Sequence, residues 1–112
     1  MDDQTKRTER IRFLNDTLRS HHSGGTVTIT AGIAQMHYTE LSNIFATIAA
    51  FDAFSDDNDP YGEHDCASET IAGRKIMWKI DYYDPTMRTG SRDPADPNQT
   101  KRVMTVMLAE EY

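Results

Sequence analysis

Apolar residues recur near the N-terminus at the spacing of an amphipathic helix. Ile11, Leu14 and Leu18 fall at i, i+3 and i+7 and form one apolar stripe. Asp3 precedes this pattern and can cap the first turn. We therefore predict a helix over residues 4–20, whose basic side chains lie mostly off the stripe and face solvent: Lys6, Arg7, Arg10, Arg12 and Arg19.

Period-two alternation indicates three strands. In residues 26–30 apolar side chains alternate with threonines, and residues 65–71 follow a weaker version of the same pattern. Residues 75–83 give the strongest signal, and Gly73 in the short gap before them predicts a hairpin with the preceding strand. One face of this third strand is apolar and consists of Ile76, Trp78, Ile80 and Tyr82.

Two further segments have the pattern of helices. Residues 39–53 begin with Thr39 as a cap and carry apolar side chains at positions 0, 3, 4 and 7, namely Leu41, Ile44, Phe45 and Ile48. Residues 97–110 follow Asp96 and begin with Pro97, which suits the first position of a helix. This last segment is apolar over most of a helical circumference, through Val103, Met104, Val106, Met107 and Leu108.

Together these elements predict one α+β domain over residues 1–112. The expected order is helix, strand, helix, hairpin and helix, with a small antiparallel sheet packed by the helices. A chain of 112 residues fits a single domain. We expect its core to consist of Leu14, Leu18, Val27, Ile29, Leu41, Ile44, Phe45, Ile48, Ile76, Trp78, Ile80, Val103, Met107 and Leu108.

The charge of the chain is concentrated in one stretch, residues 51–70. This stretch contains no Lys or Arg, and the formal net charge of the whole chain is −6. The rest of the chain is therefore close to neutral. The acidic side chains of the stretch are Asp52, Asp56, Asp57, Asp59, Glu63, Asp65 and Glu69.

Several classes of protein are disfavoured by composition. An acidic total disfavours direct binding to a nucleic-acid backbone, whereas it suits a basic protein partner. No apolar run approaches the ~18 residues that a membrane helix needs, and the charged N-terminus is unlike a signal peptide. Cys66 is the single cysteine, so an internal disulfide is impossible and a reducing compartment is favoured. We expect a cytoplasmic protein.

Long stretches of the chain carry a resemblance to one family. They are DNDPYGEHD (57–65), WKIDYYDP (78–85), DPADP (93–97) and RVMTVMLAEEY (102–112), together with RIRFLNDTLR (10–19) and TVTITAGI (26–33). The chain resembles the bacterial domain-of-unknown-function family 3768, which is common in alphaproteobacteria. The resemblance implies an association with plasmids and integrative elements. It implies no catalytic residues, because the family has none established.

A metal site in the acidic stretch is one hypothesis. A calcium loop of the EF-hand type started at Asp57 fails, because Tyr61 occupies the fifth position and Ser68 the twelfth. An irregular divalent site stays open, and it would make the protein a metal-dependent hydrolase that activates a water. The residues of that alternative are Asp57, Asp59, Glu63, His64 and Asp65. We assign no catalytic residue, no metal ligand and no cofactor.

Binding to a protein is the hypothesis that we prefer. Seven carboxylates in one stretch repel one another unless a partner or solvent screens them. Such a surface can mimic nucleic-acid phosphates, and so inhibit a nucleic-acid-handling defence complex in the manner of anti-CRISPR or anti-restriction proteins. A solvated acidic loop without a partner is the remaining alternative. The residues expected to meet the partner are Phe54, Asp56, Asp57, Asp59, Tyr61, Glu63 and Asp65.

Overall fold

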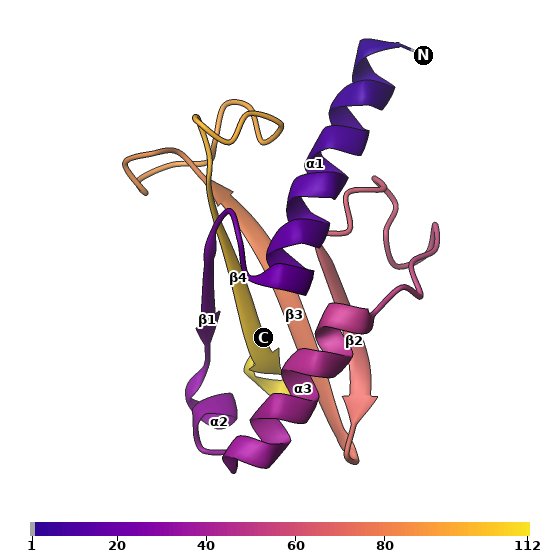
Figure 1. The fold of residues 1–112 in the computed structure, drawn as a ribbon, viewed down its shortest axis with the longest axis vertical. Helices are drawn as coiled ribbons and strands as arrows, with labels where there is room; N and C mark the ends of the chain where they lie inside the picture. The colour runs from indigo at the N-terminus through magenta and orange to yellow at the C-terminus, as the bar shows by residue number, and fades with distance from the viewer. Residues whose placement is uncertain (1) are drawn as a thin grey trace.

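The computed structural model describes residues 2–112, which form three α-helices, a four-stranded sheet and a final 3-10 turn (Figure 1). The predicted α+β fold class is confirmed. In chain order the elements are α1 (Asp3–His21), β1 (Thr26–Ile29), α2 (Ala31–Ala34), α3 (Tyr38–Ala50), β2 (Cys66–Ile71), β3 (Arg74–Tyr83), β4 (Lys101–Leu108) and η1 (Ala109–Glu111).

The strands form one sheet in the order β1-β4-β3-β2. The predicted hairpin of β2 and β3 is present, and β3 also pairs antiparallel with β4. β1 pairs with β4 in parallel, so that Thr28 lies beside Thr105. The sheet is therefore mixed, and the expectation of a purely antiparallel sheet is wrong. A parallel pair needs a long crossover, and here the rest of the chain, from α2 to β3, provides it.

The prediction of a last helix over residues 97–110 is wrong, because this segment contains the central strand β4. Arg102, Met104 and Val106 alternate into the core, while Met107 on the opposite face is also buried. A strand that is apolar on both faces lacks period-two alternation and looks like a buried helix in sequence. The expected cap, Asp96, instead closes a turn by accepting a hydrogen bond from the backbone N–H of Asn98 at 2.9 Å.

The ends of the correctly predicted helices differ by a few residues. Asp2, rather than Asp3, caps α1 by accepting a hydrogen bond from the backbone N–H of Thr5. His37, two residues before the expected Thr39, caps α3, and α3 ends at Ala50. The short helix α2 has no counterpart among the predicted elements.

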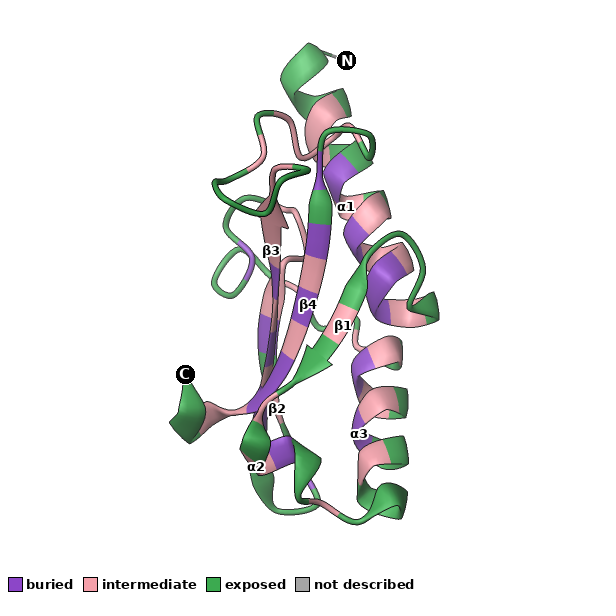
Figure 2. Ribbon diagram, turned by 90° about the vertical axis from the view of Figure 1, so that its left-hand side faces the viewer, coloured by how far each residue is buried: buried purple, intermediate pink, exposed green. Residues whose placement is uncertain are grey.

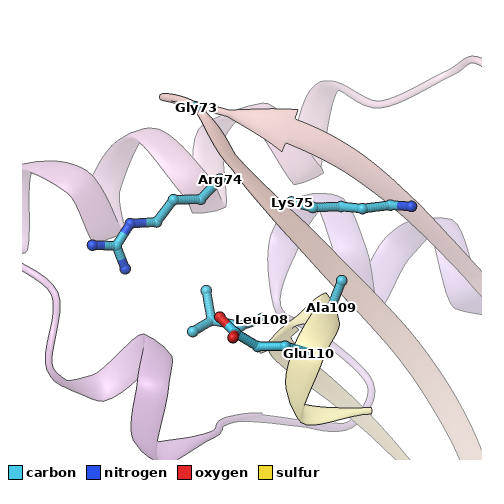
Figure 3. A pocket seen from close by; sticks show the side chains of 6 residues that line it. All are labelled: Gly73, Arg74, Lys75, Leu108, Ala109 and Glu110. Carbon is cyan, nitrogen blue, oxygen red and sulfur yellow. The ribbon is translucent and has the colours of Figure 1, made fainter.

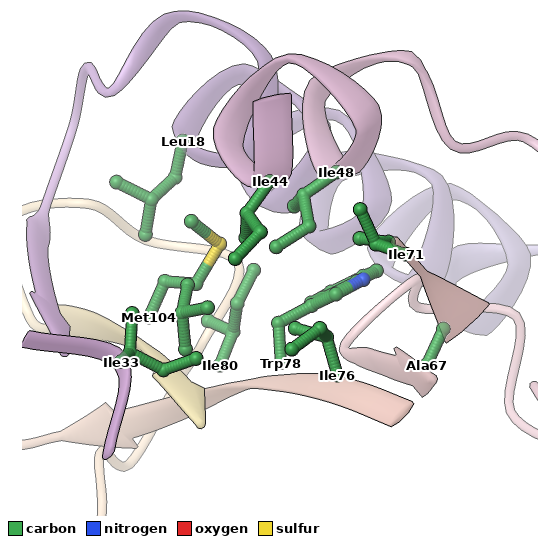
Figure 4. Packing of buried hydrophobic residues seen from close by; sticks show 11 residues of the cluster. Leu18, Ile33, Ile44, Ile48, Ala67, Ile71, Ile76, Trp78, Ile80 and Met104 are labelled. Carbon is green, nitrogen blue, oxygen red and sulfur yellow. The ribbon is translucent and has the colours of Figure 1, made fainter. Parts of the chain in front are cut away.

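The hydrophobic core lies between the sheet and the two long helices. α1 and α3 cover the same side of the sheet (Figure 2). In Figure 4, Ile44 and Ile48 reach from α3 toward Ile80 and Trp78 on β3, and Leu18 of α1 points toward Met104. Trp78 is 1% exposed. Of the predicted core, the structure buries Leu18, Ile44, Ile48, Ile76, Trp78, Ile80 and Met107; it half-buries Leu14, Val27, Leu41, Phe45, Val103 and Leu108 and leaves Ile29 exposed.

Candidate functional site

Residues 51–65 link α3 to β2, and we call them the acidic loop. Short-range hydrogen bonds shape this loop. Asn58 bonds the backbone at both ends of a turn, since its side chain accepts from the N–H of Ser55 and donates to the carbonyl of Ala53. Asp59 and Gly62 add backbone bonds to Ser55 and Asp59, respectively. The loop thus has a defined conformation of its own.

His64 joins the acidic loop to α1. Its Nδ1 hydrogen-bonds Oδ1 of Asp16 at 2.8 Å, and its Nε2 lies 3.6 Å from Oδ2 of Asp59. Its backbone N–H also donates to Asp59, at 3.1 Å, from a left-handed conformation with φ of 54°. The imidazole stacks on the ring of Phe54, with centroids 3.7 Å apart. Two carboxylates and an aromatic ring therefore fix this histidine in place.

Arg19 on α1 contacts two members of the same cluster, Asp16 and Phe54. It is 5% exposed, donates to Asp16 at 2.7 Å, and lies 5.3 Å from the ring centroid of Phe54 and 5.5 Å from that of Trp78. Its guanidinium also meets the C-terminal end of α3, where helix carbonyls lack partners within the helix. The carbonyls that accept from it belong to Ile48, Ala49 and Phe51.

A second polar network holds the end of the acidic loop. Asn15 is fully buried and donates to the carbonyl of Glu63 at 3.0 Å and to the hydroxyl of Tyr82 at 2.7 Å. The Tyr82 hydroxyl donates in turn to Oε1 of Glu63, and Arg102 donates to Oδ1 of Asn15. Burial, and then the hydrogen bond to Glu63, raise the pKa of Tyr82 above its ordinary value.

The predicted site residues divide into two groups. Asp59 is 6% exposed and Glu63 is half-buried, and both hydrogen-bond within the protein. Phe54 and Asp65 are also half-buried, and burial raises the pKa of the Asp65 carboxyl. Only part of the expected surface therefore faces solvent, and with the neighbouring Asp52 it forms what we call the exposed set: Asp52, Asp56, Asp57 and Tyr61.

One family model matches the chain over residues 29–111, under the description "Protein of unknown function (DUF3768)". The chain belongs to this family. No curated protein and no solved structure matches the chain. The span that matches DUF3768 includes the whole acidic loop and β2 to β4, whereas α1 precedes it.

In this DUF3768 chain, α1 supplies side chains that the sequence interpretation assigned to solvent or to no role. Arg12 donates to the carbonyl of Gly62 at 2.6 Å, and Asn15, Asp16 and Arg19 hold the rest of the loop. One signal was present in the sequence. Asn15 lies at i+4 from Ile11 on the apolar stripe, and a polar side chain there needs a buried hydrogen-bond partner.

Two hollows of the surface bear on ligand binding. The larger, of about 590 Å³, lies between the β2–β3 turn and η1, at the opposite end of β2 from the acidic loop. Figure 3 shows that the Arg74 and Lys75 side chains that line it point apart, so they do not converge on a ligand. The smaller, of about 160 Å³, lies beside Phe54, Asp59 and His64.

Metal binding finds no support in the arrangement of side chains. Among residues 2–112, no group of three or more His, Cys, Asp or Glu side chains is placed to hold a metal ion. Within the same residues no helix is long and apolar enough to cross a membrane. The site is therefore best described as a structured loop that presents the exposed set.

Proposed function

We propose that this DUF3768 chain is a protein-binding factor whose acidic loop docks on a basic surface of a partner. The observation that carries the proposal is the division of the loop's side chains into two groups. Asp59, Glu63 and His64 hold the loop in place, and the exposed set is left without a role inside the fold. A structured loop with free carboxylates suits a basic protein surface.

Preorganisation supports this proposal. α1 holds the loop at three points along its second half, through Arg12 to Gly62, Asn15 to Glu63 and Asp16 to His64. A loop that is already ordered loses less conformational entropy when it binds. The alternative, a solvated loop without a partner, does not require these contacts with α1, because exposed carboxylates are equally well hydrated on a mobile loop.

Tyr61 supplies an aromatic anchor next to the charges. Its side chain is 79% exposed, in the second half of the acidic loop. Tyrosine is enriched among the residues that dominate binding energy at interfaces, because it buries a large area and keeps a hydroxyl for a hydrogen bond. Phe54, the other predicted anchor, instead packs inside the protein against His64 and Trp78.

A narrower form of the proposal concerns the partner's own ligand. In a bacterial cytoplasm, the partner would be a basic nucleic-acid-binding complex, and the exposed carboxylates would take the place of phosphates, as in an anti-CRISPR or anti-restriction inhibitor. The net charge of −6 supports this form. A competition experiment tests this form of the proposal, because a DNA or RNA duplex should then displace the protein from its partner.

The test is affinity capture with a charge-reversed loop. Asp56→Lys/Asp57→Lys changes two exposed carboxylates, and Glu9→Lys/Glu40→Lys changes the charge equally on exposed helix positions elsewhere. We expect partners to be retained by wild type and by the helix variant, and lost by the loop variant. Capture of the same proteins by all three would refute the proposal.

Salt and Tyr61 provide a second test once a partner is in hand. The association rate should fall as ionic strength rises past ~0.1 M, where the screening length is about 10 Å. Tyr61→Ala should weaken binding through a faster dissociation rate, because an anchor acts mainly after contact is made. The metal-dependent hydrolase stays a prediction that no observation favours.

A further inference from the structure

The outer edge of β2 has unpaired backbone groups. β2 is a terminal strand of the sheet, and β3 is its single neighbour. The N–H of Ile80 donates to the carbonyl of Asp65. Because hydrogen-bonded pairs alternate along an antiparallel ladder, the backbone N–H and C=O groups of Ala67, Glu69 and Ile71 also point toward β3. The N–H and C=O groups of the intervening residues therefore point outward, and these residues are Cys66, Ser68 and Thr70.

A groove runs along this edge, between β2 and α3. Its volume is about 390 Å³. Small side chains on α3 and just after it leave the groove open, while Phe51 gives it an apolar wall. The residues that line it are Ala46, Thr47, Ala50, Phe51, Asp52, Ala53 and Glu69. A side chain from a strand beside β2, pointing to the helical side of the sheet, would enter this groove.

The carboxylate of Glu69 makes the groove favour a cationic ligand. Among residues 2–112, its Oε2 has no hydrogen-bond partner, although that atom is buried. Leaving a buried acceptor unpaired costs on the order of 1–3 kcal/mol, and more for a charged group. Asp52, at the start of the acidic loop, lines the same groove. A cationic side chain of a ligand would satisfy both the geometry and the charge.

We propose that an extended basic segment of the partner adds to β2 as a fifth strand and inserts a Lys or Arg side chain toward Glu69. Its backbone would pair with Ser68 and Thr70, and its alternate side chains would enter the groove. This inference rests on the proposed function and names the binding mode. Strand addition of this kind takes affinity from backbone hydrogen bonds and specificity from pockets for alternate side chains.

A second copy of the chain is a poorer occupant of this edge. Pairing β2 with another β2 would bring two copies of Glu69 and Asp52 to one interface. Like charges at an interface disfavour association. A basic segment removes this repulsion instead of doubling it.

The probe is a fluorescent peptide of alternating valine and lysine, eight residues long, with a matched valine–glutamate peptide. Binding is measured by fluorescence anisotropy. Ser68→Pro removes an outward N–H without removing a hydrogen bond to β3, and Ser68→Ala is its matched control. Glu69→Gln removes the charge in the groove, and Glu40→Gln does the same on the surface of α3. We expect Ser68→Pro and Glu69→Gln each to weaken binding at least tenfold.

Both controls should bind the lysine peptide as wild type does, and the glutamate peptide should not bind. Hydrogen exchange gives an independent readout, since the amides of Ser68 and Thr70 should become protected when the lysine peptide binds. Three results would overturn the inference: no binding of the lysine peptide, equal binding by Ser68→Pro, or a wild-type dimer that Ser68→Pro converts to a monomer.

The loop variant separates this inference from the proposed function. If Asp56→Lys/Asp57→Lys loses the captured partner while Ser68→Pro keeps it, the acidic loop binds and the β2 edge does not. If Ser68→Pro loses the partner while the loop variant keeps it, the edge binds and the proposed role of the loop fails. Loss in both variants supports the two together.

Discussion

Phe54 and His64 stack almost face to face, with their ring planes 5° from parallel, although they lie near opposite ends of the acidic loop. Phe54 also meets Trp78 edge-on at 6.1 Å, so the stack connects the loop to the core. The residues between them consequently form a loop whose two ends are held together. Fixing both ends of a loop limits the conformations of everything between them.

Replacing Phe54 by Ala should lower the free energy of unfolding by about 2 kcal/mol. This is less than the cost at a fully buried phenylalanine, because Phe54 is only half-buried. Urea denaturation followed by tryptophan fluorescence measures the change, since Trp78 adjoins the site. Phe13→Ala is the control, because Phe13 is 59% exposed. A loss below ~0.5 kcal/mol would mean that the stack contributes little to the fold.

Asp59 and Asp57 should respond differently to the same change. Asp59→Ala removes the carboxylate that accepts from the backbone of His64, and it should cost about 1–2 kcal/mol. Asp57 is exposed, so Asp57→Ala should change stability by less than ~0.5 kcal/mol. Thermal unfolding of the two variants side by side measures the difference. Equal melting temperatures would contradict the internal role of Asp59.

Arg19→Met should destabilise the protein by about 2–4 kcal/mol. The substitution keeps much of the side-chain volume but leaves the carbonyls of Ile48 and Phe51 without their donor. Arg19→Lys should recover part of the loss, because a lysine keeps the charge but not the planar set of donors. Arg10→Met, at an exposed position of α1, is the control for equilibrium denaturation. Identical losses for the methionine and lysine variants would show that the donor geometry does not matter.

The raised pKa of Tyr82 predicts that the folded protein loses stability at alkaline pH. Burial, and then Glu63, raise its pKa in the folded state above 10.0. Above about pH 10 the unfolded chain releases the phenolic proton while the folded chain retains it, so unfolding becomes more favourable as pH rises. This stabilisation is fully present below that pH.

Tyr82→Phe should flatten the alkaline decline while lowering stability at neutral pH, because Asn15 and Glu63 lose a hydrogen-bond partner. Urea unfolding between pH 8 and about pH 11 measures both effects. Tyr61→Phe is the control, since Tyr61 is 79% exposed and should leave the decline unchanged. An undiminished slope in Tyr82→Phe would assign the decline to other groups.

The parts of the fold that follow a regular period were predictable from the sequence. α1, α3 and the β2–β3 hairpin each bury one face and leave the other in solvent, so apolar positions recur at 3.6 or 2 residues. β4 breaks this rule, since Arg102 is buried on the side of Met104 while Met107 is buried on the other. The β-branched residues Val103, Thr105 and Val106 were a local signal for a strand.

The candidate site was predicted in position but not in organisation. The concentration of carboxylates located the loop, since charge is visible in composition. Which carboxylates turn inward depends on α1, whose Asn15 and Asp16 are about 48 residues away in sequence from the loop residues that they bond. Such long-range pairing leaves no periodic mark on the loop itself, so Asp59 could not be distinguished from Asp57.

The parallel pairing of β1 with β4 has a consequence for biosynthesis. β4, which lies between β1 and β3, follows both of them in sequence, so a nascent chain that ends before Lys101 contains both neighbours of β4 but not β4 itself. Trp78 and Ile80 then lack their partners Val106 and Met104. Contacts between distant parts of a sequence form slowly. The sheet therefore cannot close until β4 has been synthesised, and until then the apolar strands that flank it are exposed to association with other chains.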